Sequence, residues 1–269
     1  MDLGLKNKTY IVTGATRGLG LATARELVAD GANVLISGRT QQAVDTAVAE
    51  LEKLGTAHGS GTAPGSGATT GTAHGLVADN AAPDTADRLI AEATTRFGRF
   101  DGILISVGGP QAGPVETTPE SAWRDAFESV FLGALRLART AAAALPSGGV
   151  IGFVLSSSVR QPIPGLGISN GLRPGLAMAA KSLADELGPR GIRVLGLLPA
   201  RIDTDRVREL DALAPDPEAA RDHHSATIPL RRYGTPEEFG KVAAFVLSPA
   251  ASYLTGLMVP VDGGALRSL

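Results

Sequence analysis

The sequence contains no cysteine and only four histidines among its 269 residues. The absence of cysteine excludes disulfide scaffolds, thiolate nucleophiles, iron–sulfur clusters and every zinc site built with cysteine. The histidines form no HExxH or other spacing typical of metal ligands; they are His58, His74, His223 and His224. We therefore predict no metal site.

An excess of charge of one sign and long apolar runs are also missing. The formal net charge is -2 with both signs interspersed, and three tyrosines and one tryptophan leave little for base stacking. This composition argues against a nucleic-acid partner. No apolar run is long enough to span a bilayer, and residues 1–10 are polar where a secretory signal is apolar. We expect a cytoplasmic protein without a membrane partner.

Short apolar runs alternate with longer stretches of helical period. The predicted strands are 10–13, 33–37, 75–78, 102–106, 150–155, 193–198 and 257–261. The predicted helices are 18–31, 41–54, 84–97, 120–145, 169–187 and 235–247. Parallel strands need crossover connections, which place helices on both faces of the sheet. The pattern predicts one α/β domain over residues 1–269, a doubly wound parallel sheet of Rossmann-like architecture.

Residues 55–75 interrupt this alternation. The segment consists almost wholly of Gly, Ala, Ser, Thr, Pro and His, so it has no apolar face to bury. We predict a disordered insertion before the third strand. A metal chelate between His58 and His74 is the alternative that we do not favour, because polar loops commonly carry stray histidines.

A glycine-rich turn follows the first predicted strand, where residues 13–20 read TGATRGLG. Glycine lets the backbone turn tightly and approach a pyrophosphate, whose charge the following helix N-terminus meets. Such a turn can also be purely structural. At the first strand-to-helix junction of a doubly wound sheet, however, it lies where ligands bind. We predict that the turn contacts a dinucleotide through Gly14, Thr16, Arg17, Gly18, Leu19 and Gly20.

This TGxxxGxG spacing resembles the nucleotide-binding motif of the short-chain dehydrogenase/reductase family. Residues 199–204 (PARIDT) resemble the PGxxxT turn of that family, and residues 228–238 and 255–264 resemble its C-terminal signature. The resemblance covers nearly the whole chain outside 55–75 and is greatest to the 3-ketoacyl-carrier-protein reductase branch. It implies further contacts to the cofactor from Asp79, Gly108, Pro199, Ile202 and Thr204.

The end of the second strand bears on the choice of cofactor. A carboxylate there accepts from the ribose 2′-hydroxyl of NAD(H), whereas the 2′-phosphate of NADP(H) needs a cation. Residues 37–40 read SGRT and contain no acid, and Arg17 adds a second guanidinium to Arg39. Two arginines can bind a phosphate in bidentate fashion. We predict NADP(H) over NAD(H), with Arg39 as a merely solvated residue as the alternative.

The catalytic positions depart from the family pattern, which uses Asn, Ser and a Tyr and Lys four residues apart. The resemblance of residues 182–194 to the family's helix and next strand places Ser169 at the Tyr position and Arg173 at the Lys position. It places Ser156 at the Ser position and Val130 near the Asn position. No shift of the alignment restores the pattern, because the tyrosines lie elsewhere and no lysine occurs between residues 53 and 181.

The spacing of four keeps Ser169 and Arg173 on one helical face. An aliphatic hydroxyl is a far weaker acid than a phenol, and a guanidinium does not exchange protons near neutral pH. Arg173 can still hold the cofactor ribose or an anionic substrate group. We assign Ser156, Ser169 and Arg173 to catalysis, although the family's Tyr mechanism does not transfer.

Three interpretations of the altered centre remain open. The first, which we favour, is an atypical reductase of a small carbonyl or alcohol substrate, with the proton supplied by water held by Ser156 and Ser169 or by His223 or His224. The second is non-redox chemistry, such as dehydration, isomerisation or cyclisation. The third is a catalytically silent nucleotide-binding or partner subunit.

Residues 199–232 are long, charged and rich in proline, which is typical of a substrate lid. We expect a partly helical lid near 205–213. Its arginines Arg201, Arg206 and Arg208 either favour an anionic substrate or form solvated charge. We also expect a homodimer or homotetramer, because small residues in 171–180 permit close helix packing, and a gap or kink at Pro174.

Overall fold

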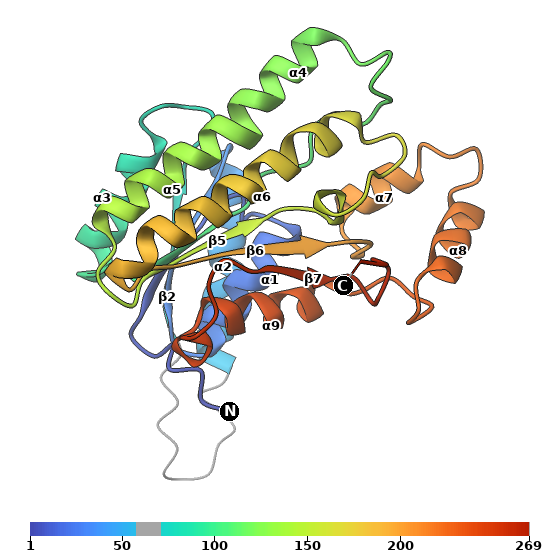
Figure 1. The fold of residues 1–269 in the computed structure, drawn as a ribbon. Helices are drawn as coiled ribbons and strands as arrows, with labels where there is room; N and C mark the ends of the chain where they lie inside the picture. The colour runs from blue at the N-terminus through green and yellow to red at the C-terminus, as the bar shows by residue number, and fades with distance from the viewer. Residues whose placement is uncertain (58–70, 269) are drawn as a thin grey trace.

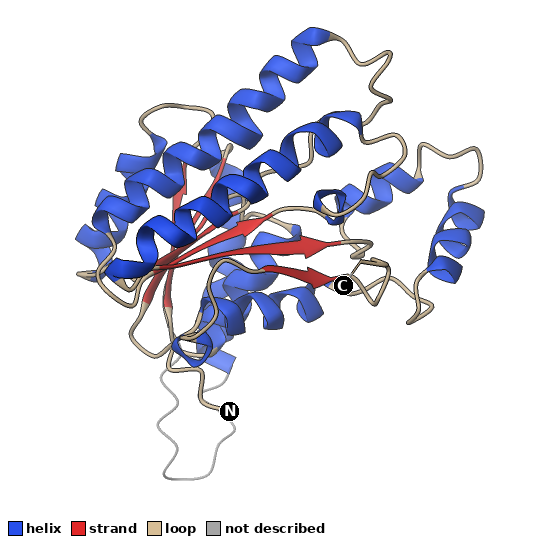
Figure 2. Ribbon diagram, viewed as in Figure 1, coloured by secondary structure: helices blue, strands red, loops and turns tan. Residues whose placement is uncertain are grey.

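The computed structural model describes residues 1–57 and 71–268. Its core is a parallel sheet of seven strands in the order β3-β2-β1-β4-β5-β6-β7. The strands are β1 (Thr9–Val12), β2 (Asn33–Gly38), β3 (Ala73–Val77), β4 (Gly102–Ile105), β5 (Val150–Val154), β6 (Arg193–Pro199) and β7 (Met258–Val261). The doubly wound parallel sheet that the sequence predicts is confirmed (Figure 2).

Helices cover both faces of this sheet, as Figure 1 shows. The helices are α1 (Gly18–Ala29), α2 (Gln41–Ala57), α3 (Thr85–Phe97), α4 (Glu120–Ala126), α5 (Gly133–Ala144), α6 (Gly167–Leu187), α7 (Asp205–Asp211), α8 (Pro217–Thr227) and α9 (Pro236–Leu247). One apolar core packs the sheet against α3, α5 and α6, and the other packs it against α1, α2 and α9.

The central strands are buried on both faces because their apolar side chains alternate. Ile103 and Ile105 of β4 contribute to the core under α3, α5 and α6, whereas Leu104 contributes to the opposite core. Burial on both sides explains why these strands are continuous apolar runs in the sequence. Because β1, β4, β5 and β6 pair in parallel, their carboxyl ends lie at one edge of the sheet.

The order of the strands reverses between β1 and β4, which are neighbours although residues 13–101 separate them along the chain. Connections leaving the two strands run in opposite directions and open a crevice at their carboxyl ends. The glycine-rich turn after β1 and the loop after β4 meet at this crevice. The topology therefore determines where a ligand can bind.

The predicted helix 120–145 differs from the structure. It is divided into α4, a π-helical turn η1 (Phe127–Leu132) and α5. A π-helical turn widens a helix locally and is frequent near functional sites. Val130 in this turn is buried against Ile168, the residue before Ser169. The wide turn thus supports the start of α6, which carries two predicted catalytic residues.

Other differences concern a helix that was not predicted and the ends of two elements. The chain forms α8 within the predicted lid, a helix that the sequence analysis does not predict because its polar residues show no apolar stripe. Of the predicted insertion 55–75, residues 55–57 belong to α2 and 73–75 to β3, while 58–70 lie outside the described residues. His58 lies there as well, and His74 pairs with Glu92, with 3.1 Å between Nε2 and Oε1.

In the described ranges, no helix combines the length and apolar character required to cross a membrane.

Candidate active site

A cavity of about 840 Å³ lies at the carboxyl ends of the strands. The turn after β1, the loops after β4, β5 and β6, and helices α6, α7 and α8 contribute to its lining. All predicted site residues line it except Thr16 and Asp79. The cavity thus brings together residues that are as far apart in sequence as Gly14 and Thr204.

The glycine-rich turn lines the end of the cavity at which we predict a dinucleotide, called the dinucleotide end below, and is closely packed. Gly14 has a φ of 56°, and a Cβ there would lie 2.7 Å from the carbonyl oxygen of Ser106. A Cβ at Gly20 would lie 2.8 Å from the carbonyl oxygen of Gly14. Helix α1 begins at Gly18 without a side-chain cap, so its first N–H groups are free to meet an anion.

Three polar residues hold this turn against the loop after β4. The Thr13 hydroxyl donates to the carbonyl of Ser106 at 2.9 Å and accepts from the Ser106 N–H at 2.9 Å. The amide of Asn80 donates to the Thr13 hydroxyl at 3.2 Å and to the Ser106 carbonyl at 3.3 Å. The sequence analysis missed Asn80, although its position in the loop that follows the third strand was a usable signal.

Asp79 and Thr16, the two predicted site residues that do not line the cavity, make structural contacts instead. The Asp79 carboxylate accepts from the N–H of Ala81 at 3.0 Å, and its carbonyl accepts from the Thr85 hydroxyl at 2.6 Å, so Asp79 shapes the entry to α3. The Thr16 methyl group packs where a side chain at Gly38 would lie. Contacts of these two residues with a cofactor stay predictions.

Arg17 and Arg39 line the same end of the cavity. Arg17 is exposed, with its Nη1 atom 3.5 Å from Asp205 Oδ2 and 3.6 Å from Glu209 Oε1 of α7. Arg39 is exposed and has no ion-pair partner within the described ranges. Exposed ion pairs contribute little to stability, so both guanidiniums are available to an incoming anion.

At the catalytic end, Ser169 forms a buried hydroxyl pair. Its Oγ atom lies 3.1 Å from the Oγ atom of Ser158. Ser156 accepts from the N–H of Ser158 at 3.1 Å and caps the short helical turn after β5. The sequence analysis assigned Ser156 but not Ser158, because only the tertiary structure brings the turn after β5 beside α6.

Arg173 lies one helical turn after Ser169 and is also buried, with 5% of its surface exposed. Its Nη1 atom donates to the carbonyl of Val154 at 2.5 Å. Burial lowers the pKa of Arg173 to about 10, so the side chain stays protonated at neutral pH. Because the Val154 carbonyl holds it and it stays protonated, Arg173 is a fixed cation rather than a proton donor.

The helix that carries both residues begins at Gly167, well before Pro174. Pro174 has no N–H to donate to the carbonyl of Asn170, so the helix lacks one backbone bond next to Arg173. The side chain of Asn170 secures this turn in another way. It accepts from the N–H of Ile163 at 3.0 Å and donates to the carbonyl of Ile163 at 2.9 Å.

No tyrosine is among the residues that line the described cavity. Tyr10 belongs to β1 and is buried, and its hydroxyl donates to the carbonyl of Leu247. Tyr233 is buried, and its hydroxyl donates to Asp211 at 3.3 Å. Tyr253 is fully exposed. The catalytic end therefore offers hydroxyl groups and a cation, but no phenol.

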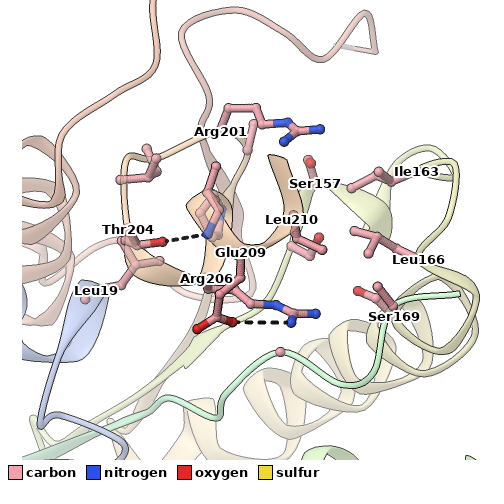
Figure 3. A pocket seen from close by; sticks show the side chains of 18 of the residues that line it. Leu19, Ser157, Ile163, Leu166, Ser169, Arg201, Thr204, Arg206, Glu209 and Leu210 are labelled. Carbon is pink, nitrogen blue, oxygen red and sulfur yellow. Dashed lines mark hydrogen bonds and ion pairs between the residues drawn. The ribbon is translucent and has the colours of Figure 1, made fainter. Parts of the chain in front are cut away.

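The substrate end is lined by Arg201, Arg206 and His224, and Figure 3 shows both arginines there. Arg201 Nη1 lies 2.6 Å from Asp211 Oδ1, and Arg201 Nη2 lies 2.8 Å from His224 Nε2. Burial and the nearby Arg201 lower the pKa of His224. Since an arginine can only donate, His224 Nε2 accepts and is not a proton donor in this arrangement. His223 does not line the cavity.

Arg206 of α7 reaches across the cavity to the loop after β4. Its Nη2 atom donates to the carbonyl of Pro110 at 2.6 Å, and its Nη1 atom lies 3.8 Å from Glu209. The Arg206 side chain packs closely over Gly109, where a Cβ would lie 2.6 Å from its Nε atom. Helix α7 begins at the cap residue Thr204, whose hydroxyl accepts from the N–H of Val207.

The parallel sheet, its glycine-rich first turn and the cavity at the strand ends define the Rossmann-like class of α/β proteins. Comparisons with known proteins narrow this class. Residues 14–265 match the model of the family described as Enoyl-(Acyl carrier protein) reductase. The chain is 37% identical over 270 residues to Dehydrogenase/reductase SDR family member 4 of Bos taurus, which covers 98% of this chain and 89% of that protein.

Solved structures agree with this assignment. The fold is similar to Short-chain dehydrogenase/reductase SDR:Glucose/ribitol dehydrogenase from Brucella melitensis, with a TM-score of 0.86, 27% identity and 100% of each chain covered. It is also similar to L-sorbose reductase from Gluconobacter frateurii complexed with NADPH and L-sorbose, with a TM-score of 0.86, 26% identity and 100% of each chain covered. The chain belongs to the short-chain dehydrogenase/reductase family of oxidoreductases.

Proposed function

We propose that the protein is an NADP(H)-dependent reductase or dehydrogenase of a small carbonyl or alcohol substrate. The observation that carries the proposal is the pair of guanidiniums, Arg17 and Arg39, at the dinucleotide end of the cavity. No acid lies in residues 37–40 to accept from a ribose 2′-hydroxyl. Two cations and no carboxylate favour a 2′-phosphate.

The residues at this end fit a dinucleotide. The backbone of Gly14 and Gly20 is too closely packed for a Cβ, and the uncapped N-terminus of α1 suits a pyrophosphate. The similarity to L-sorbose reductase complexed with NADPH also supports the proposal. When bound, NADPH supplies a hydride to the substrate carbonyl carbon.

The residues of this chain would orient and polarise the substrate. The Ser169 hydroxyl, which pairs with the buried hydroxyl of Ser158, can donate to a substrate oxygen. Arg173 can hold a ribose hydroxyl without exchanging its proton. Water held by Ser156 and Ser169 remains the candidate proton source, because His224 Nε2 accepts from Arg201. Loss of a positioned general acid costs about 10²- to 10⁴-fold in rate, so we expect slow turnover.

Two further predictions belong to this proposal. Residues 199–232, with α7 and α8, serve as the substrate lid. The protein forms a homodimer or homotetramer, supported by the exposed apolar side chains Met178 and Phe127. The small residues of α6 are not the support that we expected, because Gly171 and Gly175 pack against Trp123 and Phe131 of the same chain.

A second candidate function is non-redox chemistry, such as dehydration, isomerisation or cyclisation. The observation that favours it is the absence of a phenol from the described cavity lining. A catalytically silent nucleotide-binding or partner subunit is the remaining alternative.

Titration of the protein with NADPH and NADH, measured by calorimetry, tests the cofactor. We expect tighter binding of NADPH, and Arg17→Ala and Arg39→Ala should each reduce the difference about tenfold, because each removes a charge-assisted bond to the phosphate. Arg124→Ala, which removes an exposed arginine outside the cavity, should leave both affinities unchanged. Equal affinities unaffected by either substitution would contradict the proposal, and no binding of either dinucleotide would favour a silent subunit.

A screen of carbonyl and alcohol substrates, followed at the nicotinamide absorbance, tests the reaction itself. Turnover of any substrate supports an oxidoreductase. Binding of NADPH without any oxidation or reduction across a broad panel would move the assignment to the non-redox or silent alternatives.

A further inference from the structure

We propose that the substrate end of the cavity binds an anionic group, a carboxylate or a phosphate, through Arg201 and Arg206. This inference rests on the proposed function, because it names the substrate class of the same site. The substrate would carry its anion at the lid and its carbonyl or hydroxyl group at Ser169. Figure 3 shows Arg201 and Arg206 on the lid side of the cavity, across from Ser157 and Ser169.

The distribution of charge gives the first argument. The chain as a whole has a net charge of -2. The described lining of the cavity nevertheless contains five arginines, namely Arg17, Arg39, Arg173, Arg201 and Arg206, against the two carboxylates Asp205 and Glu209. Cations gathered in a concave site raise the local concentration of anions. We assign Arg17, Arg39 and Arg173 to the dinucleotide, which leaves Arg206 and Arg201 for the substrate; the partner of Arg201, Asp211, lies outside the lining.

The support behind Arg201 gives the second argument. Asp211 is buried and accepts from both Arg201 and the hydroxyl of Tyr233. His224 accepts from the other terminal nitrogen of Arg201. These contacts use one N–H on each terminal nitrogen, and a guanidinium has five. Arg201 is therefore held in place with donors to spare, as a preorganised anion receptor needs to be.

Arg206 differs from Arg208, although both belong to α7. Arg206 is 35% exposed, lines the cavity and is bound to the neutral carbonyl of Pro110. Its nearest carboxylate, Glu209, is 3.8 Å away. Arg208 is 60% exposed, does not line the cavity and pairs with Asp203 at 2.9 Å. The helix thus directs one charge into the cavity and neutralises the other on the outer surface.

Apolar side chains also line this part of the cavity. Figure 3 shows Ile163 and Leu166 on the same side as Ser157 and Ser169, and Leu210 on the side of the arginines. Such a lining fits the hydrocarbon part of a substrate whose two ends are polar. The site therefore suits a keto or hydroxy compound with a short apolar body and a terminal anion.

The test measures binding rather than turnover, by calorimetry on the protein loaded with NADP⁺. The probes are levulinate and longer keto acids, each paired with its methyl ester, and dihydroxyacetone phosphate paired with dihydroxyacetone. The first set tests a carboxylate and the second a phosphate. We expect one anionic series to bind about tenfold or more tightly than its neutral counterpart, with the difference falling as salt is added.

Arg201→Gln and Arg206→Gln should each remove most of this preference and leave the affinity of the neutral partner unchanged. Arg208→Gln is the matched control on the same helix and should retain the preference. Arg201→Gln leaves buried Asp211 without its cationic partner and could misfold for that reason. Two controls address this: the double variant Arg201→Gln with Asp211→Asn, and a thermal unfolding curve of each variant. Arg206→Gln provides a test that does not disturb Asp211.

Equal binding of the anionic and the neutral member of every pair would overturn the inference, as would an equal loss of preference in Arg208→Gln.

The proposed function and this inference can fail separately. Selective anion binding without any hydride transfer would contradict the proposed function alone. Reduction of neutral ketones with no response to an anionic group would contradict only this inference. If NADP⁺ does not bind, the same titrations on the cofactor-free protein still test whether the site prefers an anionic ligand.

Discussion

The dinucleotide end and the catalytic end of the cavity are built by different means. At the dinucleotide end, the backbone of the turn after β1 and the start of α1 provide the surface, and glycines are required because side chains would clash. At the predicted catalytic end, we expect the side chains of Ser169 and Arg173 to provide the chemistry, from a helix that contains Pro174. The first end matches the family motif, whereas the second departs from it.

This difference shows that a fold can keep its binding geometry while its reactive groups change. A backbone site depends on torsion angles and close packing, which few substitutions tolerate. A side-chain site can change its chemistry without disturbing the helix, because Ser169 and Arg173 both fit the buried face of α6. Family membership therefore supports the cofactor site more strongly than it supports the reaction.

The largest expected effect is at the backbone end. Gly14→Val should abolish dinucleotide binding, because its Cβ would lie 2.7 Å from the Ser106 carbonyl oxygen and φ is positive. Gly188→Val is the matched control, since nothing lies within 4 Å of a Cβ at Gly188 and this residue does not line the cavity. Calorimetric titration with NADPH measures both. Normal binding by Gly14→Val would show that the turn is not the cofactor site.

The next effect concerns the catalytic end. Ser169→Tyr combined with Arg173→Lys should raise carbonyl reductase activity by about tenfold or more, as part of the ~10²- to 10⁴-fold that a general acid supplies. A phenol beside an ammonium has its pKa lowered towards the working range. We expect partial recovery. Val130 stands near the position where the family has an Asn, and it lacks the amide with which that Asn holds a water for proton transfer. The rate is measured at the nicotinamide absorbance with a panel of ketones.

Single variants sharpen this test. Ser169→Tyr alone and Arg173→Lys alone should each recover less than the pair, because the phenol and the ammonium act together. If the native protein reduces a substrate rapidly and Arg173→Ala abolishes this while Ser169→Ala does not, then Arg173 positions an anion and the proton has another source. An inactive double variant that still binds NADPH would contradict reductase geometry at this end.

The smallest expected effect lies outside the cavity, in the loop before β4. Burial would raise the pKa of Asp101, but hydrogen bonds from Arg99 and from the N–H of Thr9 outweigh it and lower the pKa overall. Because the folded-state pKa is the lower one, this stabilisation is present above the unfolded-state pKa of about 3.9 and is lost as the pH falls below it.

Asp101→Asn should therefore lower the free energy of unfolding at pH 7 by about 1–3 kcal/mol and flatten its decline below about pH 4. Urea unfolding at several pH values measures the effect. NADPH affinity of the folded variant should not change, because Asp101 does not line the cavity. An unchanged acid profile would show that Asp101 contributes no pH-dependent stability.

The sequence predicted the strands of the sheet well, because strands buried on both faces are continuous apolar runs that can be recognised in the sequence alone. The ends of helices and the polar helices were harder to predict. The lid helix α8 has no apolar stripe, and the π-helical turn η1 depends on packing of Val130 against Ile168. For the site, thirteen of the fifteen predicted residues line the cavity, because motif spacing reflects local backbone demands; the exceptions are Thr16 and Asp79.

By itself, the sequence determined the doubly wound sheet and the glycine-rich turn, and it predicts Ser169 and Arg173 at the positions where the family has Tyr and Lys. These features follow from torsion angles, burial periodicity and residue identity, which are local properties. Only the tertiary structure decided that Asn80 secures the turn, that Ser158 pairs with Ser169, and that Arg206 rather than Arg208 faces the cavity. Such contacts join residues from different elements, and their formation depends on how the sheet and helices pack.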